Sequence, residues 1–287
     1  MKDNEKQKKL KDYFKKRDDV LMAFVFGSRS KGYASERSDW DIAVYFKPLH
    51  GLEWEHDREY PAQKKVWADC VDILQTDNVD LVVLNRAPST VADSAISGIP
   101  LVIKDRRLWI EFMLRITQQA EDFRDTVQEY ADIYWRSTSL TKQDAEALNK
   151  RLVFMTTELR VLSGYTGLTI VEYKENDIKR RVVERTTENL MNATIDISKI
   201  ILASSKKPIP STYKEIVRLI SSTHYFSVET ADKLSSWTEL RNILAHEYLD
   251  ITWRQIHDFL KNSEPYFKQF IESAKKLLKK NVKNHPS

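Results

Sequence analysis

The fold of this chain is decided by two short stretches, Gly27-Ser28-Arg29-Ser30-Lys31-Gly32 and Ser38-Asp39-Trp40-Asp41. An apolar run precedes the first stretch at 21–26, and another apolar run continues from the second at 40–46. Two short apolar runs separated by polar residues predict two strands that are joined by a Gly-Ser turn and a polar loop. The turn offers backbone N–H groups and a hydroxyl, which together suit the oxygen atoms of a phosphate.

Three aspartates are expected to lie near that turn. Asp39 and Asp41 are two residues apart at the start of the second strand, so their carboxylates point to one face. Asp80 opens another Val- and Leu-rich run at 80–85, which predicts a neighbouring strand. Carboxylate oxygens are the ligands that Mg²⁺ prefers. The pattern therefore indicates a site for a metal–nucleotide complex, in which Asp80 binds the metal or accepts a proton.

The motif G-S-x10-D-x-D, followed by V-D-L-V-x-L-N-R-A-P, resembles the minimal nucleotidyltransferases of the DNA polymerase β superfamily. The resemblance covers about the first half of the chain. It implies that Gly27 and Ser28 hold the triphosphate of ATP and that Asp39 and Asp41 bind Mg²⁺. It also implies that Asp80 binds the metal or acts as the base on the incoming hydroxyl. Two-metal sites of this kind stabilise in-line displacement at phosphorus.

The length and composition of the chain limit the number of domains and the compartment that we expect. A chain of 287 residues can form two domains with separate cores. The single cysteine, Cys70, excludes an intramolecular disulfide and is typical of a reducing compartment. No run approaches the roughly 18 apolar residues of a membrane span, and the N-terminus lacks the apolar segment of a signal peptide. We therefore expect a cytoplasmic protein with no membrane partner.

The character of the sequence changes near its middle. Residues 20–105 alternate short apolar runs with helical segments, which is typical of a small α/β unit, whereas helical periodicity dominates from Arg107 onward. The polar stretch 137–141 predicts a linker, in which Ser139 or Thr141 caps the next helix.

The second half is predicted to be an all-α bundle. Apolar residues recur at helical spacing in five segments, near 142–163, 175–205, 211–222, 228–247 and 252–281. We therefore expect an α+β protein, with a polymerase-β-like nucleotidyltransferase domain at 1–138 and an all-α helical domain at 139–287.

One polar cluster stands out in the second half, Arg241-Asn242-Ile243-Leu244-Ala245-His246-Glu247-Tyr248. Asn242 and His246 are four residues apart and share a helix face, which Arg241 can reach. An arginine binds phosphate, and a histidine moves protons near neutral pH, so these groups suit a metal-independent ribonuclease. The same residues also fit an ordinary amphipathic helix whose histidine complements the helix dipole.

The pattern R-N-x3-H-x-Y at the end of a helix resembles the HEPN family, notably the toxin subunit that is paired with minimal nucleotidyltransferases. The resemblance implies that Arg241 and His246 are the ribonuclease pair, with Asn242 in support. It further implies that Tyr248 is the hydroxyl that the nucleotidyltransferase modifies, and that the protein is a homodimer through the helical domain. Here the two activities occur in one chain, whereas the family usually divides them between two adjacent proteins.

The combined hypothesis is a toxin–antitoxin-like protein that transfers AMP from ATP to Tyr248 and thereby silences cleavage of RNA by its own helical domain. A bulky, negatively charged nucleotide two residues from His246 would block RNA and repel its backbone. Two alternatives stay open. The first is a small-molecule nucleotidyltransferase of the aminoglycoside-modifying type with a non-catalytic helical domain. The second is a helical half that only dimerises or binds RNA.

Overall fold

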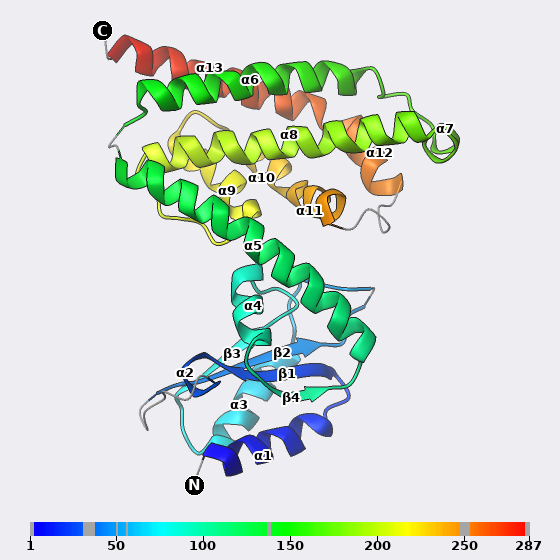
Figure 1. Cartoon of the computed structure of the whole chain (residues 1–287), viewed down its shortest axis with the longest axis vertical. Helices are drawn as coiled ribbons and strands as arrows, with labels where there is room; N and C mark the ends of the chain where they lie inside the picture. The colour runs from blue at the N-terminus through cyan, green and yellow to red at the C-terminus, as the bar shows by residue number, and fades with distance from the viewer. Residues whose placement is uncertain are drawn as a thin grey trace. The chain divides into compact units, whose positions relative to one another are not determined.

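The computed structural model describes most of the chain, namely residues 3–30, 38–49, 51–55, 57–136, 139–246 and 253–284, with backbone alone at 245–246 and 281–284. These residues form two compact units, Met1–Arg124 and Asp125–Ser287. The division falls inside one long helix, α5 (Arg106–Arg136) (Figure 1). The boundary that we expect at 138/139 lies just beyond the end of that helix, and it stays a prediction.

The first unit is a four-stranded sheet with helices on both faces (Figure 1). Its strands lie in the order β3-β2-β1-β4, and they comprise β1 (Val20–Phe26), β2 (Trp40–Phe46), β3 (Val79–Val83) and β4 (Ile99–Ile103). β2 and β3 are parallel, whereas β1 is antiparallel to both β2 and β4. Among its described residues, the helices before α5 are α1 (Asp3–Lys15), α2 (Gly27–Ser30), α3 (Ala62–Leu74) and α4 (Ser89–Ile96). The predicted strands are therefore confirmed to within two residues at their ends.

The two faces of this sheet have separate cores. Val44 belongs to the face that packs against α1 and α3, where it joins the buried ring of Phe14. Tyr45 belongs to the opposite face, where its ring lies 5.0 Å from that of Phe112 in α5. Because side chains alternate along a strand, Asp41 shares its face with Tyr45. The candidate carboxylates therefore lie at the end of the sheet, on the side that α4 and α5 cover.

The second unit is helical throughout its described residues, and none of the described helices is long and apolar enough to cross a membrane. After α5 its elements are α6 (Lys142–Ser163), α7 (Ile170–Glu175), α8 (Asp177–Ser204), α9 (Tyr213–Leu219), the 3₁₀ helix η1 (Ile220–Thr223), α10 (Val228–Ser236), α11 (Thr238–His246), α12 (Trp253–Asn262) and α13 (Glu264–Asn284). Helix α8 is central, since it packs against α6, α7, α9 and α11. The α+β fold class is thus confirmed.

The start of the first helix after the linker is also as expected. Thr141 caps α6, because its hydroxyl accepts a hydrogen bond from the backbone N–H of Asp144. The Asp144 carboxylate in turn accepts one from the backbone N–H of Thr141, which completes a capping box. The cap is therefore Thr141 and not Ser139.

Two helices that we predict as continuous are each interrupted, so those predictions are wrong. The segment 228–247 is divided at Trp237, because the hydroxyls of Ser235 and Thr238 donate to backbone carbonyls three residues earlier and compete with helical bonding. The segment 252–281 is divided at Ser263. Pro265 follows there, and proline is tolerated only in the first turn of a new helix.

Gly98 lies against the strand that leads to the candidate site. A Cβ atom at this position would lie 2.3 Å from the carbonyl oxygen of Val25 in β1. We predict that Gly98→Ala lowers the free energy of unfolding by about 3 kcal/mol, because β4 must move away from β1. Gly167→Ala is the control, since nothing lies within 4 Å of its added Cβ. Calorimetric melting of both variants checks the prediction, and equal melting profiles would contradict it.

Candidate functional site

The parallel register of β2 and β3 brings the three candidate aspartates to one face of the sheet. Asp41 pairs directly with Asp80, so both side chains point the same way. Asp39 precedes Asp41 by two residues, next to the first residue of β2. Asp39 and Asp80 are exposed and Asp41 is half-buried. The structure thus brings together the residues that the sequence singles out for this site.

The Gly-Ser turn lies directly against this group. Phe26, the last residue of β1, pairs with Asp41, and the helical turn α2 begins at the next residue, Gly27. Gly27 has a positive φ of 68°, and a Cβ there would lie 2.0 Å from the Asp41 Oδ2 atom. Only glycine therefore allows the turn and the carboxylate to approach so closely. The half-buried Ser28 follows, and the hydroxyl of Ser30 closes the turn by donating to the Gly27 carbonyl oxygen at 2.8 Å.

The negative charges of Asp39, Asp41 and Asp80 favour the binding of a cation. Partial burial, together with the neighbouring carboxylates of Asp80 and Asp39, raises the pKa of the Asp41 carboxyl, and the Arg29 guanidinium opposes this shift. Neighbouring carboxylates repel one another, and a hard divalent ion would offset that repulsion, so the donor set fits Mg²⁺. Within the described part of the chain, however, no three His, Cys, Asp or Glu side chains form a ready-made metal cluster. The three aspartates share one face without converging on one point.

In the second unit, Arg241 of α11 is held by side chains from three helices. Its Nε–H donates to the Oδ1 atom of Asn192 in α8 at 2.9 Å, and its Nη1 donates to the Oδ1 atom of Asn242 at 3.4 Å. Its guanidinium also lies 4.7 Å from the ring centroid of Tyr213 in α9, which is a cation–π distance. Asn242 and Tyr213 are buried. This arrangement fixes the orientation of the guanidinium, as binding of a phosphate requires.

The other two residues of the R-N-x3-H-x-Y pattern are only partly covered. His246 is the last residue of α11, so its backbone lies one helical turn beyond Asn242, but its side chain is outside the described atoms. Tyr248 lies outside the described residues altogether. The roles predicted for His246 and Tyr248 stay predictions.

Sequence reasoning does not assign a role to two residues that contact predicted site residues. Tyr213 supports Arg241 from 28 positions upstream, and Arg29 lies within the Gly-Ser motif itself. A usable signal exists for Tyr213. Thr212 and Glu215 form a helix-start pattern, since the Thr212 hydroxyl accepts from the Glu215 backbone N–H, and this places Tyr213 at the start of α9.

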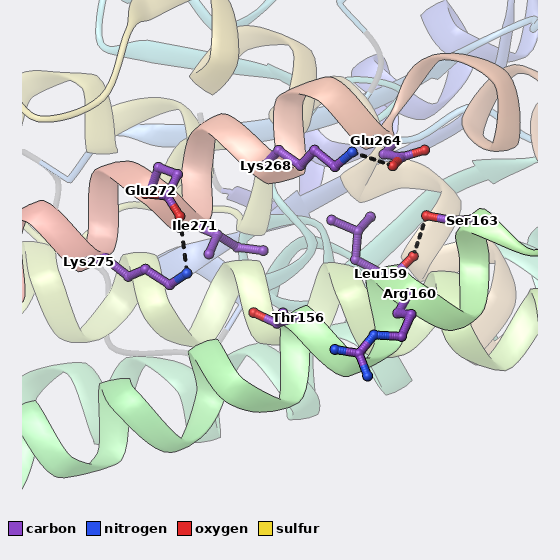
Figure 2. Close-up of a pocket in the computed structure, with 9 residues that line it drawn as sticks. All are labelled: Thr156, Leu159, Arg160, Ser163, Glu264, Lys268, Ile271, Glu272 and Lys275. Carbon is purple, nitrogen blue, oxygen red and sulfur yellow. Dashed lines mark hydrogen bonds and ion pairs between the residues drawn. The ribbon is translucent and has the colours of Figure 1, made fainter.

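A groove between α6 and α13 contains none of the candidate residues (Figure 2). Its volume is about 460 Å³, and Leu159 and Ile271 contribute apolar atoms to its lining. Its lysines are already paired with glutamates along α13, Lys268 with Glu264 at 2.6 Å and Lys275 with Glu272 at 3.0 Å. Neither the apolar lining nor these satisfied pairs indicates a particular ligand.

Comparison with known proteins finds a match in each half of the chain. Residues 8–107 match the family model "Polymerase beta, Nucleotidyltransferase", and residues 155–274 match the model "Ribonuclease HepT-like". The first of these segments covers the four-stranded sheet, so the first unit has the fold of a polymerase-β-type nucleotidyltransferase domain, and an all-α domain follows it. The two matched segments together resemble a nucleotidyltransferase domain followed by a HepT-like HEPN domain in one chain. Both resemblances are confirmed.

One solved structure and the curated proteins were also compared with the chain. A solved structure described as "Crystal structure of the toxin-antitoxin with AMP-PNP" is similar over 46% of this chain and 98% of its own, with 18% sequence identity and a TM-score of 0.42. No curated protein matches the chain significantly.

The contact between Gly27 and Asp41 generates a first prediction for this site. We predict that Gly27→Ala abolishes nucleotidyl transfer, because the added Cβ overlaps the Asp41 carboxylate at a positive φ. Gly51→Ala is the matched control, since Gly51 also has a positive φ, of 57°, but has nothing within 4 Å of an added Cβ. Labelled ATP turnover measures both. Similar losses in the two variants would show that backbone strain alone is responsible.

The raised pKa of Asp41 generates a second prediction. A carboxyl whose pKa is higher in the folded state than in the unfolded state supports folding at low pH, and this support is lost as the pH rises through the folded-state pKa. We therefore predict that Asp41→Asn raises the melting temperature at pH 7 in metal-free buffer. The gain should shrink as the pH falls toward 3.8, the ordinary aspartate pKa. Asp77→Asn, at an exposed position, is the control, and a pH-independent gain would contradict the prediction.

Proposed function

We propose that the first unit transfers AMP from ATP, with Mg²⁺, to the hydroxyl of Tyr248, and that this modification silences a ribonuclease in the second unit. The observation that carries the proposal is the Asp41–Asp80 pair on one face of the sheet, beside Asp39 and against Gly27. This combination offers oxygen ligands and a phosphate-binding turn in one place.

In the proposed transfer, the tyrosine oxygen attacks the α-phosphorus of ATP. The bond from that phosphorus to the bridging oxygen breaks, pyrophosphate leaves, and an AMP ester of tyrosine forms. Backbone N–H groups at Gly27 and Ser28 hold the triphosphate, while Asp80 accepts the proton of the hydroxyl. Asp39 and Asp41 would hold Mg²⁺, which would supply positive charge for the triphosphate and for the leaving group.

In the proposed cleavage, a ribose 2′-hydroxyl attacks the adjacent phosphorus of RNA. The bond to the 5′-oxygen breaks, which yields a 2′,3′-cyclic phosphate and a free 5′-hydroxyl. His246 moves the proton, and Arg241 stabilises the charge on the phosphate. The support for this role is the fixed guanidinium of Arg241, which Asn192 and Tyr213 orient without adding a negative charge.

We also propose that the protein is a cytoplasmic homodimer that forms through the helical unit. The support is three exposed apolar side chains on α6, since Val153, Phe154 and Val161 are 61%, 45% and 39% exposed. With both activities in one chain, the fusion would act as a toxin–antitoxin-like system in which modification keeps the ribonuclease inactive.

A growth assay tests the proposal. We predict that cells expressing Asp41→Asn stop growing, because Tyr248 is left unmodified and RNA is cleaved. Cells with the wild-type chain or with the Asp77→Asn control should grow normally. Adding His246→Ala to Asp41→Asn should restore growth, because it removes the proton-transfer group.

The purified proteins provide the second measurement. The Asp41→Asn chain should cleave RNA in the presence of EDTA and leave cyclic phosphate ends, whereas the wild-type chain should not. A harmless Asp41→Asn chain that leaves RNA intact would overturn the ribonuclease part of the proposal. Transfer of AMP to an aminoglycoside in place of Tyr248 would instead identify a small-molecule nucleotidyltransferase.

A further inference from the structure

Arg29 is the third residue of the Gly-Ser turn, yet its side chain is only 6% exposed. The guanidinium lies over the ring of Trp40, 4.4 Å from the ring centroid. Trp40 is the first residue of β2 and is almost completely buried. The arginine of the turn therefore points back toward the strand that carries the candidate metal ligands.

Its hydrogen bonds connect the two halves of the motif. The Nε–H of Arg29 donates to the carbonyl oxygen of Asp39 at 3.1 Å, and Nη2 donates to the carbonyl oxygen of Ser38. The remaining nitrogen, Nη1, donates to a carboxylate oxygen of Asp3 in α1 at 2.9 Å. All three nitrogens of one planar group are thus bonded, and two of them hold the backbone that precedes Asp41.

This geometry requires an arginine. Nε and Nη2 lie on one edge of the guanidinium plane and can donate to two successive carbonyl oxygens, while the flat face stacks on an aromatic ring. A lysine ammonium keeps the charge but lacks both the fork and the flat face. A lysine at this position would therefore leave the turn and the strand joined by a single mobile contact.

We propose that Arg29 is a positioning residue for nucleotidyl transfer, which sets the distance between the phosphate-binding turn at Gly27–Ser28 and the carboxylates of Asp39 and Asp41. The inference rests on the proposed function, because it concerns the same site. Arg29 acts through the carbonyl oxygens of Ser38 and Asp39 and the ring of Trp40, and it makes no contact with the nucleotide.

A property that depends on this distance is the thermodynamic coupling between metal and nucleotide. The turn binds the triphosphate and the carboxylates bind the metal, so the two ligands strengthen each other only when the two halves are correctly spaced. We expect Mn²⁺ to increase the affinity of the full-length wild-type chain for a non-hydrolysable ATP analogue by about 30-fold. In Arg29→Lys the gain should fall to about threefold or less, while the affinity for the analogue without metal stays near the wild-type value.

Titration calorimetry with and without Mn²⁺ measures these affinities. Arg17→Lys is the matched control, because Arg17 in the same unit also forms a fork to Asp19 and lies 5.8 Å from the ring centroid of Tyr13. It should keep the full coupling. If Arg29→Lys melts below the wild-type temperature, the titration is repeated at a temperature at which both chains are fully folded, and the loss of coupling is expected there as well.

The outcomes separate this inference from the proposed function. Coupling in the wild-type chain that persists undiminished in a folded Arg29 variant would overturn the positioning role and leave the proposed function standing. A wild-type chain that binds no ATP analogue, with or without Mn²⁺, would overturn the proposed function itself. Equal losses in the Arg29 and Arg17 variants would mean that the effect is general destabilisation, which also overturns the positioning role.

Discussion

The parallel pairing of β2 with β3 places the carboxylates of Asp41 and Asp80 side by side, and the rest of the first unit accommodates this unfavourable proximity. The absent Cβ of Gly27 lets the turn approach Asp41, and the buried guanidinium of Arg29 brings a positive charge and fixes the backbone of Asp39. Helices on both faces of the sheet hold the strands together against this repulsion. A bound cation would favour the ionised form of Asp41, whose pKa is raised by burial and by the neighbouring carboxylates.

In the second unit the charged group is an arginine, and uncharged side chains orient it. Its central helix α8 supplies Asn192, and α9 supplies the ring of Tyr213, so that Arg241 is oriented by an amide and an aromatic face. A carboxylate partner would orient the guanidinium equally well but would offset its charge. On the proposed function, each unit has a phosphate-directed site, one built from carboxylates for a metal–nucleotide complex and one built around the oriented guanidinium of Arg241. On the account proposed here, the first site controls the second through Tyr248.

Much of this arrangement could be predicted from local sequence. The strands follow from short apolar runs that turn or polar residues interrupt, and the shared face of Asp39 and Asp41 follows from their spacing of two residues. The approach of Asp80 depends on a register between strands, which spacing alone does not determine. The interruption between α10 and α11 at Trp237 could not be predicted from the spacing of apolar residues. The hydroxyl groups that bond to nearby carbonyls there leave that spacing unchanged. The contact of Tyr213 with Arg241 joins two helices that are distant in sequence, so no local pattern contains it.

The measurement that tests the central claim most directly is the intact mass of the purified full-length chain, before and after incubation with ATP and Mg²⁺, with peptide mapping around Tyr248. The account predicts that protein which starts unmodified gains one or more AMP units on Tyr248. It also predicts that the Asp41→Asn chain gains none under the same conditions. No added mass in unmodified wild-type protein, or AMP confined to another residue, would contradict the account.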